Sequence, residues 1–192
     1  MKLWSFSTTV RNPERLQSFL RFLKVLEGEV FNQDIQKEYQ ILLIKNRYYR
    51  PSHIPEKYQK AFNDPEIEIS YDMAQEVFNK SDYTDPAMRG RQSVNPLNKL
   101  GFCIARESAG EIVITELGNQ FLEAEQDFSS IFFKSLLKLQ FPNPLNKDFS
   151  AKDGFNVSPL IATMHLIAKV NAIEPCGLTQ DEFCLFIPSL ID

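Results

Sequence analysis

Residues 84–99 combine arginines with side-chain amides, the groups that most often hydrogen-bond the edges of DNA bases. Helical periodicity puts Ala87, Gly90, Val94 and Leu97 on one apolar side of this stretch. The other side is polar, and the candidate DNA contacts along the stretch are Arg89, Arg91, Ser93, Asn95, Asn98 and Lys99. This pattern predicts a helix that packs on a core through one face and contacts DNA through the other.

Arg91 is the strongest candidate for reading a base, because a guanidinium can donate two hydrogen bonds to one guanine. The alternative for Arg89 and Arg91 is a surface charge that balances acidic neighbours. Pro96 costs a helix interior about 3 kcal/mol or more, so the helix either kinks there or restarts with Asn95 as its N-cap. A restart would point free backbone amides near Asn95 at a phosphate.

A short hairpin is predicted directly after this helix. Residues 102–106 and 111–114 are β-prone runs, and the loop between them ends in a glycine. Thr115 then caps a further helix. This order of helix, hairpin and helix is typical of a winged helix-turn-helix. Glu107 and Glu111 make the hairpin tip acidic, so we expect no DNA contact from it.

Charge is divided unevenly along the chain, although the net charge is only −4. Residues 1–60 carry eleven Lys or Arg against six Asp or Glu, residues 61–130 carry five against thirteen, and the remainder five against six. The basic first third is compatible with a positive surface for DNA phosphates. Its candidate phosphate contacts are Arg11, Arg15, Lys45, Arg47 and Arg50.

The residue pattern of a metal-dependent nuclease is missing. Such enzymes commonly hold Mg²⁺ between carboxylates, one of them two positions before a lysine that orients the attacking water. None of the 25 Asp and Glu residues has a lysine two positions later, and Glu66 and Glu68 are better interpreted as a solvated strand edge. His53 and His165 cannot form a zinc or Cys–His site by local spacing. We expect His53 in a loop and His165 in a core, and no catalytic or metal-binding residue is assigned.

Composition indicates a globular protein, because 43% of the 192 residues are hydrophobic and only seven are glycine. No window approaches the roughly 18 apolar residues of a membrane span, and the N-terminus lacks a signal peptide, so we expect a cytoplasmic protein without a membrane partner. Cys103, Cys176 and Cys184 lie in apolar stretches, which favours buried free thiols.

The first half of the chain supplies helices that could position the arginines. Asn12 and Pro13 form a helix start, and apolar spacing continues to Gly28. A second helix is predicted over 35–48. Proline-rich residues 51–70 are expected to form a loop, after which Ser70 caps a positioning helix over 71–79.

The ends of the chain add further elements. Leu3, Trp4 and Phe6 predict a short leading strand, and a helix around residues 132–137 should end before Pro142. Ser158 and Pro159 begin an apolar, core-facing helix, and residues 179–182 form a capping box for another.

We therefore expect a mainly α fold with small β content (α+β), built from winged helix-turn-helix-like units. Residues 1–60 would form an N-terminal strand and basic helices packed on the winged unit of residues 61–127. Residues 128–192 would form a helical region that starts a second recognition subdomain. The final helix start so close to Asp192 suggests truncation.

Four segments in order resemble the N-terminal region of the AlwI-like type IIS restriction endonucleases and related nicking enzymes. They are LWSFSTTVRNPERLQSFLRFLKVLEG, RGRQSVNPLNKLGFCIARESAGEIVITELGNQFL, FFKSLLKLQFPNP, and NVSPLIATMHLIAKV followed by GLTQDEFCLF. The resemblance implies a double-stranded DNA-recognition region built from winged-helix-like units. It also implies a separate C-terminal nuclease domain that uses Mg²⁺, and we expect this domain to be missing from this chain. Residues 51–84 carry no motif of the family.

The leading hypothesis is therefore sequence-specific recognition of duplex DNA within a restriction or nicking endonuclease. The alternative is a winged-helix scaffold whose aromatic-rich surfaces dock a partner subunit or the nuclease domain. A complete small nuclease is a third option, disfavoured because no acid-x-Lys pair is present.

Overall fold

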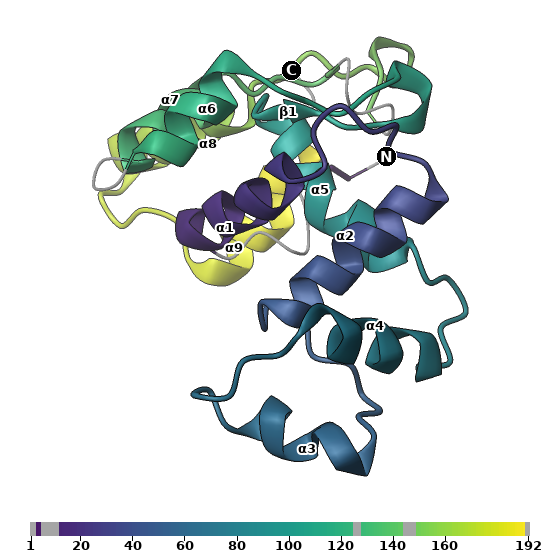
Figure 1. The fold of residues 1–192 in the computed structure, drawn as a ribbon. Coiled ribbons are helices and arrows are strands. Elements are labelled where there is room, and N and C mark those ends of the chain that lie inside the picture. The colour runs from purple at the N-terminus through teal and green to yellow at the C-terminus, as the bar shows by residue number, and fades with distance from the viewer. Residues whose placement is uncertain (1–2, 5–11, 125–127, 144–148, 191–192) are drawn as a thin grey trace.

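The computed structural model describes residues 3–4, 12–124, 128–143 and 149–190. It is mainly helical with one small antiparallel sheet, which confirms the predicted mainly α class with small β content. In chain order the elements in Figure 1 are α1 (Pro13–Lys24), α2 (Gln33–Lys45), α3 (Glu56–Asn63), α4 (Tyr71–Lys80), α5 (Met88–Lys99), β1 (Cys103–Ile104), β2 (Val113–Ile114), α6 (Glu116–Glu123), α7 (Phe128–Lys138), α8 (Pro159–Ile173) and α9 (Gln180–Phe186).

Helix starts follow the side chains that can cap them. Asn12 Oδ1 accepts a hydrogen bond from Arg15 N at 2.9 Å, and Thr115 Oγ1 accepts one from Gly118 N at 3.0 Å. Ser70 caps α4 in the same way, and Thr179 forms the predicted capping box of α9. These predicted starts are confirmed.

Helix α2 differs from its predicted range of 35–48. It begins earlier, because Asn32 Oδ1 accepts from the backbone N–H groups of Asp34 and Ile35. It ends at Lys45, since Arg47 takes a left-handed φ of 63° that cannot continue a helix.

The main core lies between α1, α2, α5, the hairpin and α6. Its fully buried side chains include Leu20, Tyr39, Leu97, Phe102 and Phe121, and the rings of Phe102 and Phe121 stack with centroids 4.4 Å apart. Residues from both predicted divisions 1–60 and 61–127 thus share one core. Burial of these large apolar groups is what holds α5 against α1 and α2.

The sheet pairs Cys103 with Ile114 and Ile104 with Val113. The segment between α1 and α2 lies beside it, because Val30 forms an antiparallel bridge to Glu111 and Gly28 N donates to Ile112 O at 2.9 Å. The hairpin and the segment between α1 and α2 are therefore joined by backbone hydrogen bonds.

Helix α5 continues through Pro96, so the alternative of a restart at Asn95 is excluded. Pro96 is buried with its neighbours Val94 and Leu97, and its own carbonyl accepts from Leu100 N at 3.0 Å. The apolar contacts of this turn offset the missing proline N–H.

Helices α3 and α4 extend from the outer end of α2 (Figure 1). Helix α3 lies inside the predicted loop of residues 51–70. A second apolar cluster joins Ile44 of α2 with Phe62 of α3 and Val77 and Phe78 of α4. Lys57 of α3 and Lys80 of α4 both form ion pairs with Glu76 of α4 and lower its pKa to about 2. The pair between Lys57 and Glu76 links α3 to α4.

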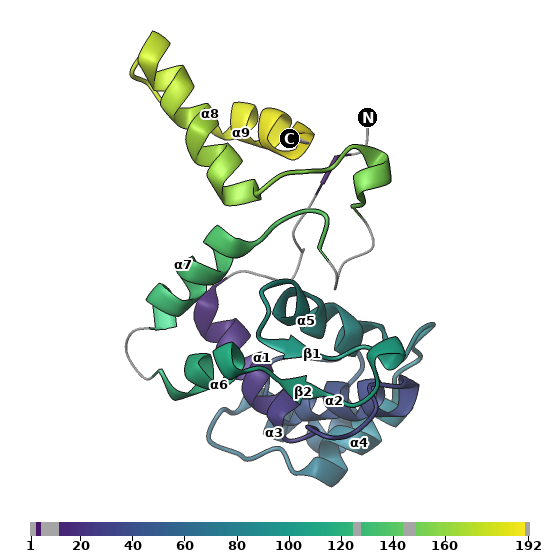
Figure 2. The same ribbon diagram turned by 90° about the horizontal axis from the view of Figure 1, so that it is seen from above.

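The C-terminal region begins with α7, which packs against α1 and α6. Helices α8 and α9 project away from the body formed by α1–α6 (Figure 2). A third apolar cluster lies near their base and contains Phe141, Phe149, Phe155 and Val157, against which Trp4 packs. Leu3 and Trp4 are not in a strand, and Phe6 of the predicted strand lies outside the described residues.

Three predictions about this region are wrong. Helix α8 is not core-facing, because Met164 is 52% exposed and Ile173 90% exposed, and His165 on the same helix is exposed rather than buried. Cys176 and Cys184 are exposed thiols, whereas Cys103 is buried as predicted. The cluster around Phe155 uses only the first turn of α8, so later residues such as Met164 and Ile173 are exposed.

No helix within the described ranges is long and apolar enough to cross a membrane.

Candidate DNA interface

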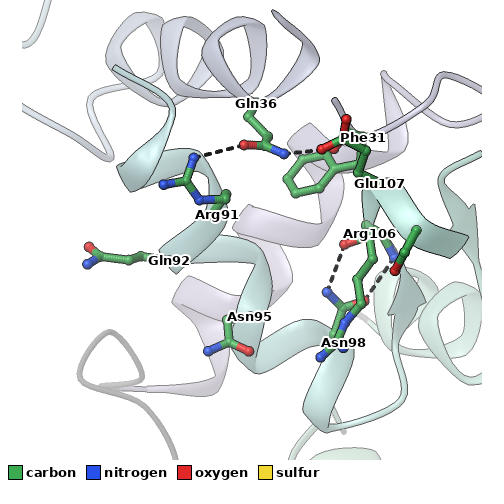
Figure 3. Close-up of a pocket in the computed structure, with 10 residues that line it drawn as sticks. Phe31, Gln36, Arg91, Gln92, Asn95, Asn98, Arg106 and Glu107 are labelled. Carbon is green, nitrogen blue, oxygen red and sulfur yellow. Dashed lines mark hydrogen bonds between the residues drawn. The ribbon is translucent and has the colours of Figure 1, made fainter. Parts of the chain in front are cut away.

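A groove of about 620 Å³ runs along the polar side of α5. Arg91, Gln92 and Asn95 line it from the helix, Gln36 and Phe31 close one end, and the hairpin supplies Arg106, Glu107 and Ser108 (Figure 3). The groove therefore combines guanidinium groups, amides, a hydroxyl and one carboxylate, that of Glu107, over a partly apolar floor. This chemistry suits the edges of nucleic-acid bases.

Arg91 is the central cation of the groove. Its Nη1 donates to Gln36 Oε1 at 3.1 Å, and its Nη2 forms an ion pair with Asp85, just before the start of α5. Arg91 holds the pKa of Asp85 below its usual range. Both side chains remain more than two-fifths exposed, so the ion pair is open to exchange with a ligand.

Asn95 lies one helical turn after Arg91 and is half-buried in the groove wall. Gln92, Gln36 and Arg106 were missed by the sequence reasoning. Gln92 could have been found from helical spacing, because residues 91, 92 and 95 fall on one face. Gln36 and Arg106 come from α2 and the hairpin, so only the fold brings them to α5.

The last turn of α5 reaches the groove through Asn98, which lines it but is buried and bonded to the hairpin. Asn98 is only 4% exposed, its Nδ2 donates to Ala105 O at 3.0 Å, and its Oδ1 accepts from Ala105 N at 2.9 Å. Lys99 and Ser93 are also buried. Asn98 thus bonds the segment that returns past the end of the helix, while Ser93 and Lys99 lie outside the groove lining.

The N-terminal basic residues are engaged within the protein. Arg47 Nη2 donates to the carbonyls of Ala61 and Asp64 at 2.9 Å, where it caps the end of α3. Arg50 donates to Phe62 O at 2.8 Å and to the side chain of Asn63. These contacts give the two predicted phosphate contacts a structural role.

Other predicted contacts are more peripheral. Arg15 Nη2 donates to Tyr48 O at 2.9 Å, and its guanidinium lies over the ring of Phe19. Arg89 is exposed beside Tyr49, with its Nη1 on Gln92 Oε1 at 3.0 Å. Lys45 is half-buried, and Arg11 lies outside the described residues. The structure thus gathers Arg91, Asn95 and Asn98 in the lining of one groove, and the other predicted cations among the described residues lie outside that lining.

The described residues contain no cluster of side chains suited to binding a metal ion. Within them no cluster of three or more His, Cys, Asp or Glu side chains could hold a metal ion. The side chains of the groove act as hydrogen-bond donors and acceptors, which suits binding.

Comparison with known protein families gives a match to a restriction endonuclease family. Residues 98–192 match the family model described as AlwI restriction endonuclease. The match runs from the end of α5 through α9 and confirms the predicted resemblance to AlwI-like restriction endonucleases. No curated protein matches the chain.

Proposed function

We propose that this chain is a sequence-specific DNA-recognition region of a type IIS restriction or nicking endonuclease. Side chains of the protein groove on α5 would contact base edges in the major groove of DNA. Arg91 and Asn95 would make the principal base contacts, with Gln92 and Arg106 beside them. The single observation that carries the proposal is this convergence of arginine and amide side chains on one exposed helical face.

The arrangement of elements supports a winged helix as the scaffold. In this interpretation α1, the bridging segment at Val30, α2, α5 and the hairpin form the unit, and α5 is the recognition helix. Helices α3 and α4 are then an insertion between α2 and α5. The positioning helix becomes α2, which packs on α5 through the main core, in place of α4.

The family match supports DNA as the partner, because restriction endonucleases act on DNA. In this proposal Mg²⁺-dependent cleavage belongs to a nuclease domain or subunit outside the described residues. The chain alone would bind duplex DNA without cleaving it, as a cytoplasmic protein.

A salt titration tests the proposal. Affinity of the purified chain for a short duplex should fall linearly on a log–log plot, with a slope of about −0.9 for each phosphate contact. The measurement is fluorescence anisotropy of a labelled duplex across a range of salt concentrations. Affinity that is independent of salt would contradict an electrostatic contact with the DNA backbone.

The second candidate is a scaffold that docks a partner subunit or domain. Exposed apolar side chains on α8 and α9, among them Met164, Ile173 and Leu185, favour it. A scaffold without a DNA-binding role would show no duplex binding at any salt concentration in the same titration.

A further inference from the structure

Gln36 is a buried polar residue at the edge of the candidate groove. It is 4% exposed, and both the nitrogen and the oxygen of its side-chain amide form hydrogen bonds. Nε2 donates to Phe31 O at 2.7 Å, and Oε1 accepts from Arg91 Nη1 at 3.1 Å (Figure 3). Because its amide nitrogen is fixed by a backbone carbonyl, its oxygen has one orientation, toward Arg91.

The backbones of α2 and α5 approach closely at this point. A Cβ atom built on Gly90 would lie 2.3 Å from Gln36 O, which only a glycine allows. The close approach brings Gln36 within reach of Arg91, the next residue along α5. Backbone packing and side-chain contact therefore act together at one place.

The other edge of Arg91 is held differently. Nη2 pairs with the Asp85 carboxylate, whose second oxygen accepts from Ala87 N at 3.2 Å near the start of α5. Asp85 is 45% exposed, whereas Gln36 is shielded from solvent. A ligand entering from solvent can displace the carboxylate, while the amide contact stays in place.

We propose that Gln36 is the positioning residue of Arg91, and that Asp85 holds the place of a guanine. In the bound state the O6 and N7 acceptors of guanine would replace the carboxylate on the guanidinium, while Gln36 retains its hold on Nη1. Gln36 itself is too buried to contact DNA. It fixes the direction of the donors and reduces the side-chain freedom that Arg91 would otherwise lose on binding. This inference rests on the proposed DNA-binding function.

The test uses two substitutions of Gln36 with different chemistry. Gln36→Met removes the acceptor at similar size, and should lower the ratio of cognate to random-duplex affinity by about tenfold. Random-duplex affinity and its salt dependence should stay as in the unmodified chain. Gln36→Glu keeps an acceptor for Arg91 but loses the donor to Phe31 O, so it should retain the ratio while lowering the melting temperature.

Loss of selectivity in Gln36→Met, together with retained selectivity but a lower melting temperature in Gln36→Glu, would distinguish positioning of Arg91 from a general effect on stability. Selectivity that follows the melting temperature in both variants, or that is unchanged in Gln36→Met, would overturn the inference. Asp85→Asn keeps an oxygen for Ala87 N and should raise cognate affinity, because no charged group has to leave Arg91. Unchanged or weaker cognate binding by Asp85→Asn would overturn the place-holder role.

Failure of the proposed function would look different. An unmodified chain that binds no duplex would remove the basis of both proposals. An unmodified chain that is selective, and that loses selectivity with Arg91→Ala but not with Gln36→Met, would overturn the positioning role alone.

Discussion

Two asparagines three residues apart on α5 both line the groove but differ in burial. Asn95 lies in the groove wall, half-buried, whereas Asn98 is buried and makes two hydrogen bonds with the backbone of Ala105. The first is available to a ligand, while the second fastens the start of the hairpin to the helix. We therefore expect Asn95 to matter for ligand binding and Asn98 for stability.

Substituting each asparagine by alanine should separate these roles. Asn98→Ala leaves the N–H and C=O of Ala105 without their partner, and should lower the free energy of unfolding by about 1–3 kcal/mol. Asn95→Ala should change it by less than about 0.5 kcal/mol and weaken cognate DNA binding instead. Urea unfolding and duplex binding measure the two effects. A larger loss of stability in Asn95→Ala than in Asn98→Ala would contradict the assignment.

The sequence predicted the residue types of the site better than their exposure. Helical periodicity places Arg91, Asn95 and Asn98 on one face, but it contains no information about the segment that returns past the end of the helix. Likewise, the sequence predicts Arg47 as a phosphate contact, but in the structure its guanidinium donates to carbonyls at the end of α3. Linear clusters of charge become surface clusters only if the fold leaves them exposed.

Among the elements, the contact between α2 and α5 positions the groove. Gly90 allows the two backbones to approach, and the hairpin and α6 hold α5 from the other side through Phe102 and Phe121. A change in the distance between α2 and α5 would move Gln36 away from Arg91. The geometry of the site thus depends on one residue without a side chain.

Gly90→Ala tests this dependence. Helix propensity alone favours alanine by about 1 kcal/mol, but the added Cβ would lie 2.3 Å from Gln36 O. Overpacking of this kind should lower the free energy of unfolding by about 1–3 kcal/mol, and should also weaken selective DNA binding. Asn95→Ala on the same helix is the matched control for stability. A stabilised Gly90→Ala variant would show that the close approach is not required.

Local signals predicted most helix starts, because Asn12, Ser70, Thr115 and Thr179 each accept a hydrogen bond from the first turn of their own helix. Helix α3 was missed, since Pro55 precedes it and no side chain caps it. Its stability comes from the apolar cluster with α2 and α4, which lies beyond the reach of local sequence patterns.

At the scale of the whole molecule, one body carries the groove and a C-terminal pair of helices projects from it (Figure 2). Apolar residues in α8 predicted a core helix, yet most of that helix is exposed because the nearest cluster contacts only its first turn. Composition indicates that a helix can be buried, but its neighbours decide whether it is. The family match supports a role in DNA restriction, and the groove locates the proposed recognition surface.

Selection of binding sites from a random duplex library tests the central claim most directly. The unmodified chain should enrich one short asymmetric sequence, and Arg91→Ala should lose preference at one base pair, at a cost of about 1–3 kcal/mol for the original site. Lys169→Ala, which removes an exposed positive charge from α8, is the matched control and should enrich the same sequence as the unmodified chain. No enrichment by the unmodified chain, or identical preferences in Arg91→Ala at every position, would contradict base recognition by the α5 groove.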